Sequence, residues 1–138
     1  MGTRADFYVG KHETAEWIGS IAWDGYRAGI DNAVLSAVTE ESFRAAITRF
    51  FTKREDATLP DQGWPWPWDT SATTDRSYWF FDEKVHEVRW GGCYVPVSVP
   101  NDDFEDAEEQ GEPVQFPDMS DQACVTLGSR SGLIILNT

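Results

Sequence analysis

The stretch TEESFRAAITRFFTKR, residues 39–54, governs much of the fold, because its apolar residues recur with the period of a helix. Thr39 is a good N-cap, and the two glutamates after it lie in the first turn, where the helix dipole favours negative charge. One stripe of the helix carries its apolar side chains, Phe43, Ala46, Ile47, Phe50 and Phe51. We therefore predict a helix over 40–54 whose phenylalanines pack against a sheet.

Two extended stretches precede this helix. TRADFYVG at 3–10 and EWIGSIAWDG at 16–25 are typical of strands, and the short loop between them fits an antiparallel hairpin. One face of the second stretch carries, at period two, Trp17, Gly19, Ile21 and Trp23. We expect the large side chains of this face to form the surface on which the helix packs.

Further strands are predicted after the helix. The chain alternates over 77–82 and 85–90, and the charged residues 82–84 supply the turn of a hairpin. Pro96 confines the next strand, 93–99, to a sheet edge or a bulge. Two apolar runs near the end, 125–127 and 133–136, are expected to be short strands. The prediction is a single α+β domain over 1–138, an antiparallel β-sheet with one main amphipathic helix packed on it and a long acidic insertion at 100–122.

The net charge of −13 is concentrated near the end of the chain. Residues 1–99 hold 15 acids and 10 bases, a net of −5, whereas residues 100–138 hold nine acids and one base, a net of −8. Such a field repels nucleic acid and anionic membranes and attracts basic protein surfaces. Direct binding of DNA or RNA is therefore not expected, and a basic protein is the expected partner.

Cysteine and histidine are scarce, with Cys93, Cys124, His12 and His86 the complete set. Without a CxxC pair, this set predicts neither a disulfide framework nor a zinc site, and no cofactor is expected. The start MGTRADF lacks the apolar core of a signal peptide, and no apolar run is long enough to span a membrane. A reducing cytoplasm is the expected location.

QGWPWPWD, residues 62–69, places Trp64, Trp66 and Trp68 at alternate positions with prolines between them. The prolines favour a stiff, extended or polyproline backbone, which loses little conformational entropy when it docks. One interpretation is an aromatic flap that closes one end of the core. The other is a rigid ridge that binds a partner, because tryptophan is enriched among interface anchors.

The acidic insertion contains three adjacent pairs of acids that repeat every third residue: Asp102, Asp103, Glu105, Asp106, Glu108 and Glu109, with Glu112 after them. An EF-hand alignment on Gly111 fails, because Pro117 would stand where the bidentate glutamate belongs. In a helix the seven charges would lie roughly 2.4 Å apart along the axis, approaching the spacing of duplex DNA, about 1.7 Å. Phe104 and Ala107 would give such a helix a footing on the domain. The insertion is either a solvating disordered loop or a patch that occupies a basic groove on another protein. A looser carboxylate site for a divalent ion is the minor alternative.

Catalytic motifs are weak. His86 lies in a predicted strand, and Cys93 follows Gly91 and Gly92 without a visible partner in the sequence. No phosphate-binding loop or nucleophile elbow is present. We expect a protein that is not an enzyme, with a small enzyme that uses Cys93 or His86 as the alternative.

At TRADFYVG, EWIGSIAWDGY and TLPDQGWPWPWD the chain resembles a group of small proteins from bacteria, prophages and phages. Small acidic phage proteins are similar in size and charge to inhibitors of host defence, including anti-CRISPR proteins, some of which resemble nucleic acid electrostatically. This similarity in size and charge, together with the net charge of −8 over residues 100–138, leads us to expect a non-enzymatic inhibitor, in the cytoplasm of a bacterial host, of a basic nucleic-acid-handling protein or complex. The acidic pairs would be the contacts and the three tryptophans of 64–68 possible anchors. A structural or interaction module with a solvating loop is the alternative, and the oligomeric state is left open.

Overall fold

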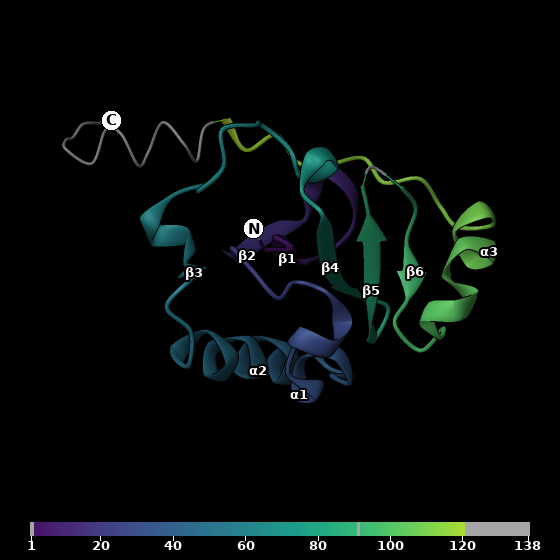
Figure 1. The fold of residues 1–138 in the computed structure, drawn as a ribbon, viewed down its shortest axis with the longest axis horizontal. Helices are drawn as coiled ribbons and strands as arrows, with labels where there is room; N and C mark the ends of the chain where they lie inside the picture. Colours follow the sequence, from purple (N-terminus) through teal and green to yellow (C-terminus); the bar gives the residue numbers. More distant parts are fainter. Residues whose placement is uncertain (1, 91, 121–138) are drawn as a thin grey trace.

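The computed structural model describes residues 2–90 and 92–120, which form a six-stranded sheet with helices beside it (Figure 1). The strands are β1 (Ala5–Val9), β2 (Glu16–Ile21), β3 (Ala57–Thr58), β4 (Arg76–Phe81), β5 (Lys84–Arg89) and β6 (Val95–Pro96). Their order across the sheet is β3-β2-β1-β4-β5-β6. The helices are α1 (Asn32–Leu35), α2 (Glu40–Thr52) and α3 (Phe104–Glu109).

The α+β class is confirmed, but the prediction of an antiparallel sheet is wrong, because the sheet is mixed. The hairpin β1–β2 is antiparallel, whereas β1 and β4 run parallel, with Ala5 opposite Arg76 and Val9 opposite Phe80. A parallel pair requires a crossover connection, usually a helix. Here the connection between β2 and β4 carries α2 across one face of the sheet, so that β4 returns beside β1 in the same direction.

Helix α2 begins after Thr39, which forms a capping box with Ser42. The Thr39 hydroxyl accepts a hydrogen bond from the Ser42 N–H at 3.0 Å, and the Ser42 hydroxyl accepts one from the Thr39 N–H at 3.2 Å. The helix buries its apolar stripe against the sheet, where Phe43 stacks on Phe80 with ring centroids 5.4 Å apart. It ends at Thr52, two residues before the predicted end.

The prediction for the face of β2 is wrong at both tryptophans. Trp17 packs on the face opposite α2, against Trp64, and Trp23 lies after the strand and is 48% exposed. The cause is a bulge: Phe7 pairs with Gly19 but Tyr8 pairs with Trp17, so that Ile18 is an extra residue and the alternation reverses. Gly19 has a φ of 145°, and a Cβ there would collide with the Phe51 ring.

Strands β4 and β5 form the predicted hairpin, but its turn has two residues rather than the predicted three, because Lys84 is the first residue of β5. Asp82 and Glu83 form the turn between β4 and β5 with φ values of 53° and 64°, the left-handed geometry that such tight hairpins require. Pro96 lies in β6 at the sheet edge, although that strand is much shorter than the predicted 93–99. The predicted strands at 125–127 and 133–136 lie outside the described residues.

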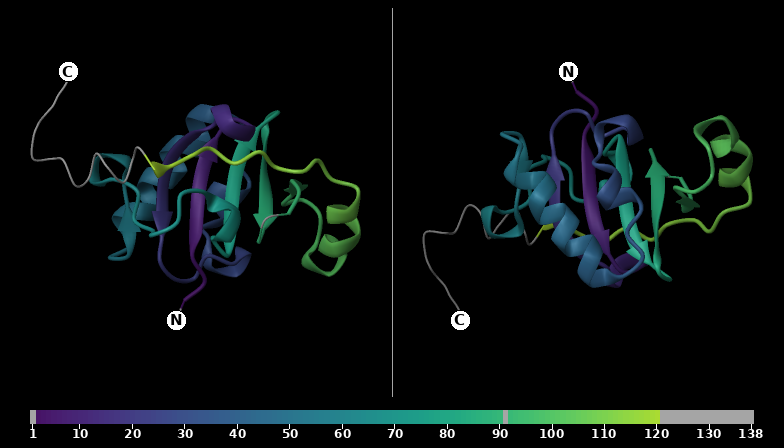
Figure 2. Two further views of the ribbon diagram at one scale, coloured as in Figure 1. Left: turned by 90° about the horizontal axis from the view of Figure 1, so that it is seen from above. Right: turned by 90° about the horizontal axis from the view of Figure 1, so that it is seen from below.

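Irregular chain covers the second face of the sheet (Figure 2). The tryptophan flap, residues 64–69, and a strap, residues 113–119, pack there on the aromatic side chains Tyr8, Trp17, Trp79 and Tyr94. The Met119 N–H donates to the Asp69 carbonyl at 2.6 Å and joins the strap to the flap. The sheet thus lies between a helical layer and an aromatic layer. Within the described ranges, no helix has the length and apolar character needed to cross a bilayer.

Candidate partner-binding surface

Most of the acidic pairs lie on a folded segment. A 3-10 turn, Asn101–Asp103, continues into α3, beyond the outer strand β6 (Figure 1). The acidic array, defined as Asp102, Asp103, Glu105, Asp106, Glu108 and Glu109, is exposed except for half-buried Glu108. None of its six carboxylates forms an ion pair with another residue of the described chain. The interpretation as a disordered loop therefore does not hold for 101–109, which carries six unpaired charges on a defined backbone.

Phe104 fastens this segment to the sheet. Its side chain is only 1% exposed, and the guanidinium carbon of Arg89 lies 3.7 Å from its ring centroid. Arg89 also donates to the Asn101 side-chain oxygen at 2.7 Å. A cation this close to an aromatic face is attracted by the ring quadrupole. Arg89 of β5 thus contacts both Asn101, at the start of the acidic segment, and Phe104, the side chain that packs this segment on the domain.

Arg89 belongs to a cluster that we name the arginine seat, formed by Arg27, Arg76 and Arg89 around Glu87. The Glu87 carboxylate is fully buried and accepts from Arg27 Nε at 2.6 Å, from Arg76 Nη1 at 2.6 Å and from Arg89 Nε at 2.9 Å. Burial by itself would raise the pKa of Glu87, but hydrogen bonds and positive charge from Arg89 and Arg27 outweigh it and lower that pKa. Three guanidinium groups and one carboxylate leave an excess of two positive charges beside the acidic array.

The arginine seat also fixes the chain that leads into the array. Arg27 Nη1 donates to the carbonyls of Val97 and Val99, at 3.3 and 2.5 Å. The Arg27 Nη2 atom is buried without a hydrogen-bond partner among the described residues. Residues 97–104 are therefore tied to β5 and to the loop at Arg27, which sets the position of α3.

A second clamp holds the chain after α3. The Tyr94 N–H donates to the Glu112 carbonyl at 3.0 Å, and the Glu112 carboxylate pairs with Lys11 at 2.8 Å and with His12 at 2.6 Å. Hydrogen bonds from Lys11 and His12 lower the pKa of the Glu112 carboxyl. Glu112 is thus engaged within the domain, which separates it from the six unpaired acids of the array.

The three indoles of the tryptophan flap are used inside the domain. Trp64 is buried and donates from Nε1 to the Trp68 carbonyl at 2.5 Å. Trp66 donates to an Asp6 carboxylate oxygen at 2.7 Å, and Trp68 donates to the Thr74 hydroxyl at 2.9 Å. Trp66 and Trp68 are half-buried and stack on each other at 5.8 Å. This arrangement favours the interpretation of the segment as a cover for the core.

Asp6 is the polar centre beneath the flap. Its carboxylate is fully buried and accepts from Ser20 at 2.5 Å and from Ser71 at 2.6 Å, besides the Trp66 indole. Burial raises the pKa of Asp6, and hydrogen bonds from Ser20, Ser71 and Trp66 oppose that shift. The network joins β1, β2, the flap and the turn at Ser71, so Asp6 acts as an internal tie closed off from solvent.

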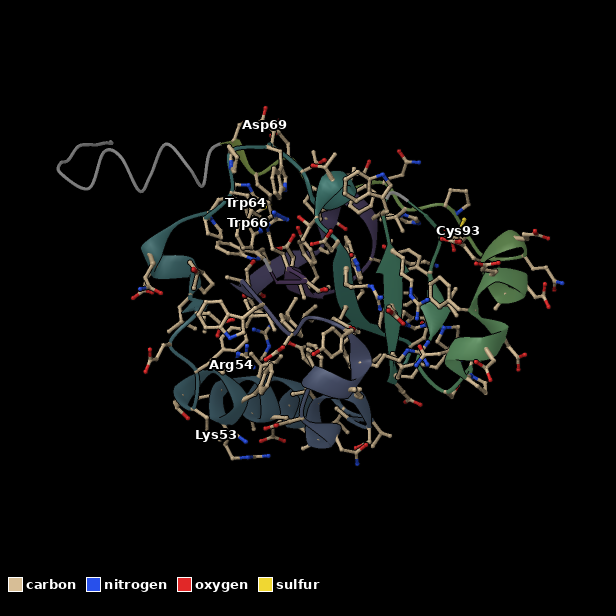
Figure 3. The ribbon with its side chains drawn as sticks, in the orientation of Figure 1. Lys53, Arg54, Trp64, Trp66, Asp69 and Cys93 are labelled. Atoms are coloured by element: carbon tan, nitrogen blue, oxygen red, sulfur yellow. The ribbon has the colours of Figure 1, made fainter. Side chains whose placement is uncertain are left out.

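The structure does not bring the two predicted contact sets together. Trp64 and Trp66 lie near one edge of the sheet, whereas Cys93 and α3 lie at the other (Figure 3). Neither Asp6 nor the arginine seat was identified from the sequence. Asp6 stands in the strand pattern as an isolated acid, and Arg27, Arg76 and Arg89 are separated by 49 and 13 residues, so no local motif indicates either group.

His86 and Cys93, the two residues that a small enzyme would use, lie in different surroundings. His86 is 5% exposed, stacks on Phe81 with ring centroids 3.8 Å apart, and has a pKa lowered to about 4 by burial. Cys93 is half-buried and faces Pro113 in an isolated bridge. In the chain described at 2–90 and 92–120, no hydrogen bond links the two, and no group of three or more His, Cys, Asp or Glu side chains could hold a metal ion.

The acidic array, the arginine seat and the tryptophan flap are described from the residues and geometry of this chain alone. Comparison with protein-family models, with curated proteins and with solved structures finds no match.

Proposed function

We propose that this chain is a non-enzymatic inhibitor that binds a basic nucleic-acid-handling protein or complex of a bacterial host. The carboxylates of the acidic array would occupy positions on the partner that nucleic-acid phosphates otherwise take. The observation that carries this proposal is the set of six unpaired carboxylates on a segment that Phe104 and the arginine seat hold in place.

The spacing of the charges supports phosphate mimicry. Six acids fall within residues 102–109, and a helical backbone places them roughly 2 Å apart along the axis. In an extended chain the same charges would be about 4 Å apart. Duplex DNA carries one charge per roughly 1.7 Å of axis. The helical conformation of Phe104–Glu109 therefore brings the charge density of the array close to that of the ligand it would replace.

The arginine seat supports a binding role for the acidic array over a role in solubility alone. A loop that only solvates a domain gains nothing from a defined conformation, since exposed charges interact with water equally well in a disordered chain. Here a buried aromatic side chain, an Arg89–Asn101 hydrogen bond and the Lys11–Glu112 ion pair fix both ends of the segment. Preorganisation of this kind lowers the entropic cost of binding.

Association should be driven by long-range attraction. The net charge of −13 steers a basic partner toward the chain, and the density of unpaired acids at α3 directs the encounter to that edge. Attraction between exposed charges is screened over about 8–10 Å at physiological ionic strength. Binding should therefore weaken steeply as salt rises.

The test is capture from a bacterial lysate, with identification of the bound proteins and competition by added duplex DNA. In the test variant the six acids of the array are replaced by their amides. The matched control changes the same number of exposed acids elsewhere, each to its amide, at Glu13, Glu55, Asp61, Asp69, Asp82 and Glu83. Both variants lose the same net charge, so only the location of the change differs.

We expect the wild type and the control to capture a nucleic-acid-binding protein that DNA displaces, and the array variant to lose it. Association rate should fall first, because steering acts on the encounter. An array variant that keeps full affinity, with no competition by DNA, would contradict the proposal.

A further inference from the structure

Trp90 differs from the other tryptophans of the chain. It is 65% exposed, the highest value among the large apolar side chains of the described residues. Five other indoles donate hydrogen bonds inside the domain, namely Trp17, Trp64, Trp66, Trp68 and Trp79. The Trp90 indole donates none to a described residue. A large aromatic side chain is thus mostly presented to solvent, and its N–H has no partner among the described residues.

The backbone at Trp90 is unusual as well. Its φ is 38°, in the left-handed region, which is a genuine outlier for a bulky side chain. The turn is closed by a hydrogen bond from the Gly92 N–H to the Arg89 carbonyl at 3.0 Å. Strained conformations of non-glycine residues cost free energy and cluster at binding and catalytic sites. Among the described residues, neither burial nor a hydrogen bond of the Trp90 side chain compensates this strain.

Trp90 stands beside the acidic array. Arg89, its neighbour in the chain, is the residue that stacks on Phe104. Gly92 lies directly against the Glu108 carboxylate, with no room for a Cβ between them. Two residues of chain span at most about 7 Å, so the Trp90 backbone lies close to the array. The backbone of an exposed tryptophan therefore lies near the Glu108 carboxylate of the acidic array.

We propose that Trp90 is the aromatic anchor of the interface that the acidic array forms, and that it receives an arginine side chain of the basic partner. A guanidinium stacks on an indole face by cation–π attraction and planar contact, more favourably than the ammonium of lysine. The neighbouring carboxylates would compensate its charge. Tryptophan and arginine are both enriched among the residues that contribute most binding energy at interfaces. This inference depends on the proposed function, because it assigns the partner's contact chemistry at the same surface.

Trp23 is the matched comparison. It is 48% exposed, and its carbonyl accepts from Arg54 Nη2 at 2.8 Å. Beside Trp23 the Arg54 guanidinium pairs with Asp56 at 2.7 Å and with Asp24 at 3.8 Å, so these carboxylates are already engaged within the domain. The carboxylates of the acidic array form no ion pair with a described residue, so the two exposed indoles differ in whether the acids near them are free to bind a partner's cation.

The experiment measures the affinity of two fluorescently labelled probes of equal charge, nona-arginine and nona-lysine, for the full chain at low salt. The proteins compared are the wild type, Trp90→Ala, Trp23→Ala and the amide variant of the array. Circular dichroism checks that each is folded, and Trp90→Leu provides a second variant that keeps an apolar side chain but removes the π-system.

We expect the wild type to bind nona-arginine more tightly than nona-lysine. Trp90→Ala and Trp90→Leu should reduce this preference by about two- to fivefold, the factor that an exposed cation–π contact contributes. Both should lower the affinity for nona-lysine less than that for nona-arginine, and Trp23→Ala should keep the preference.

A preference that persists undiminished in both Trp90 variants would overturn the assignment of Trp90 while leaving the acidic array as the binding surface. If the array variant binds both peptides as tightly as the wild type does, the proposed function itself fails.

Discussion

The guanidinium carbon of Arg89 lies 3.7 Å above the ring centroid of Phe104, and this contact connects a buried ion cluster to an exposed charged surface. On one side Arg89 pairs with the fully buried carboxylate of Glu87. On the other side it covers the single buried side chain of α3. The position of the acidic array is thus determined by residues of the sheet rather than by α3 itself, which at six residues is too short to be stable alone.

Phe104→Ala should release α3 from the domain. The substitution removes a ring that is 1% exposed, so we expect a loss of about 3 kcal/mol in the free energy of unfolding, the low end for a buried phenylalanine, because an edge site can partly collapse. Hydrogen exchange of amides in 101–109 should accelerate more than exchange in the β4–β5 hairpin. Glu105→Ala, at the exposed neighbouring position, is the control. Unchanged exchange in 101–109 would show that Phe104 does not hold the segment.

Phe50→Ala should destabilise the whole fold. Phe50 is 3% exposed and meets Phe7 of β1 edge to face, with ring centroids 6.4 Å apart. Truncation of a phenylalanine packed in this way costs about 3–5 kcal/mol, measurable as a shift of the urea midpoint. Thr48→Ala, on the exposed side of the same helix, should change the midpoint little. A Phe50→Ala midpoint equal to that of the wild type would contradict the packing of α2 on the sheet.

Asp6 should make stability depend on pH in a defined direction. Its folded-state pKa is raised above the ordinary value of 3.8, chiefly by burial, so the folded protein binds this proton more tightly than the unfolded chain does. The contribution is fully present below pH 3.8 and is lost as pH rises through the raised pKa. Relative to Asp6→Asn, which does not titrate, the wild type should therefore lose stability as pH rises.

Urea unfolding of both proteins, at several pH values between about 3.5 and 7, measures this difference. Asp61→Asn, the same replacement at an exposed position, provides the control. A difference between wild type and Asp6→Asn that stays constant across this range would mean that burial does not perturb Asp6.

Elements that depend on neighbouring residues could be predicted from the sequence. The apolar stripe and the Thr39 cap indicated a helix close to the observed Glu40–Thr52, and alternation with a charged turn indicated the hairpin of β4 and β5. The parallel pairing of β1 with β4 was missed, because it joins Ala5 to Arg76 across 71 residues. The bulge at Ile18 was missed as well, since Gly19 shows no local sign of its contact with Phe51.

The candidate surface also combines features that depend on neighbouring residues with features that depend on distant contacts. The sequence by itself determined the number of acids, their close spacing and the presence of Phe104 among them, because these are properties of consecutive residues. Only the tertiary structure decided that Arg27, Arg76 and Arg89 gather around Glu87 and that Arg89 covers Phe104. It also decided that the flap indoles turn inward while Trp90 stays exposed. Burial and charge compensation depend on which distant segments meet, and those contacts form only when the sheet brings β4, β5 and the loop at Arg27 together.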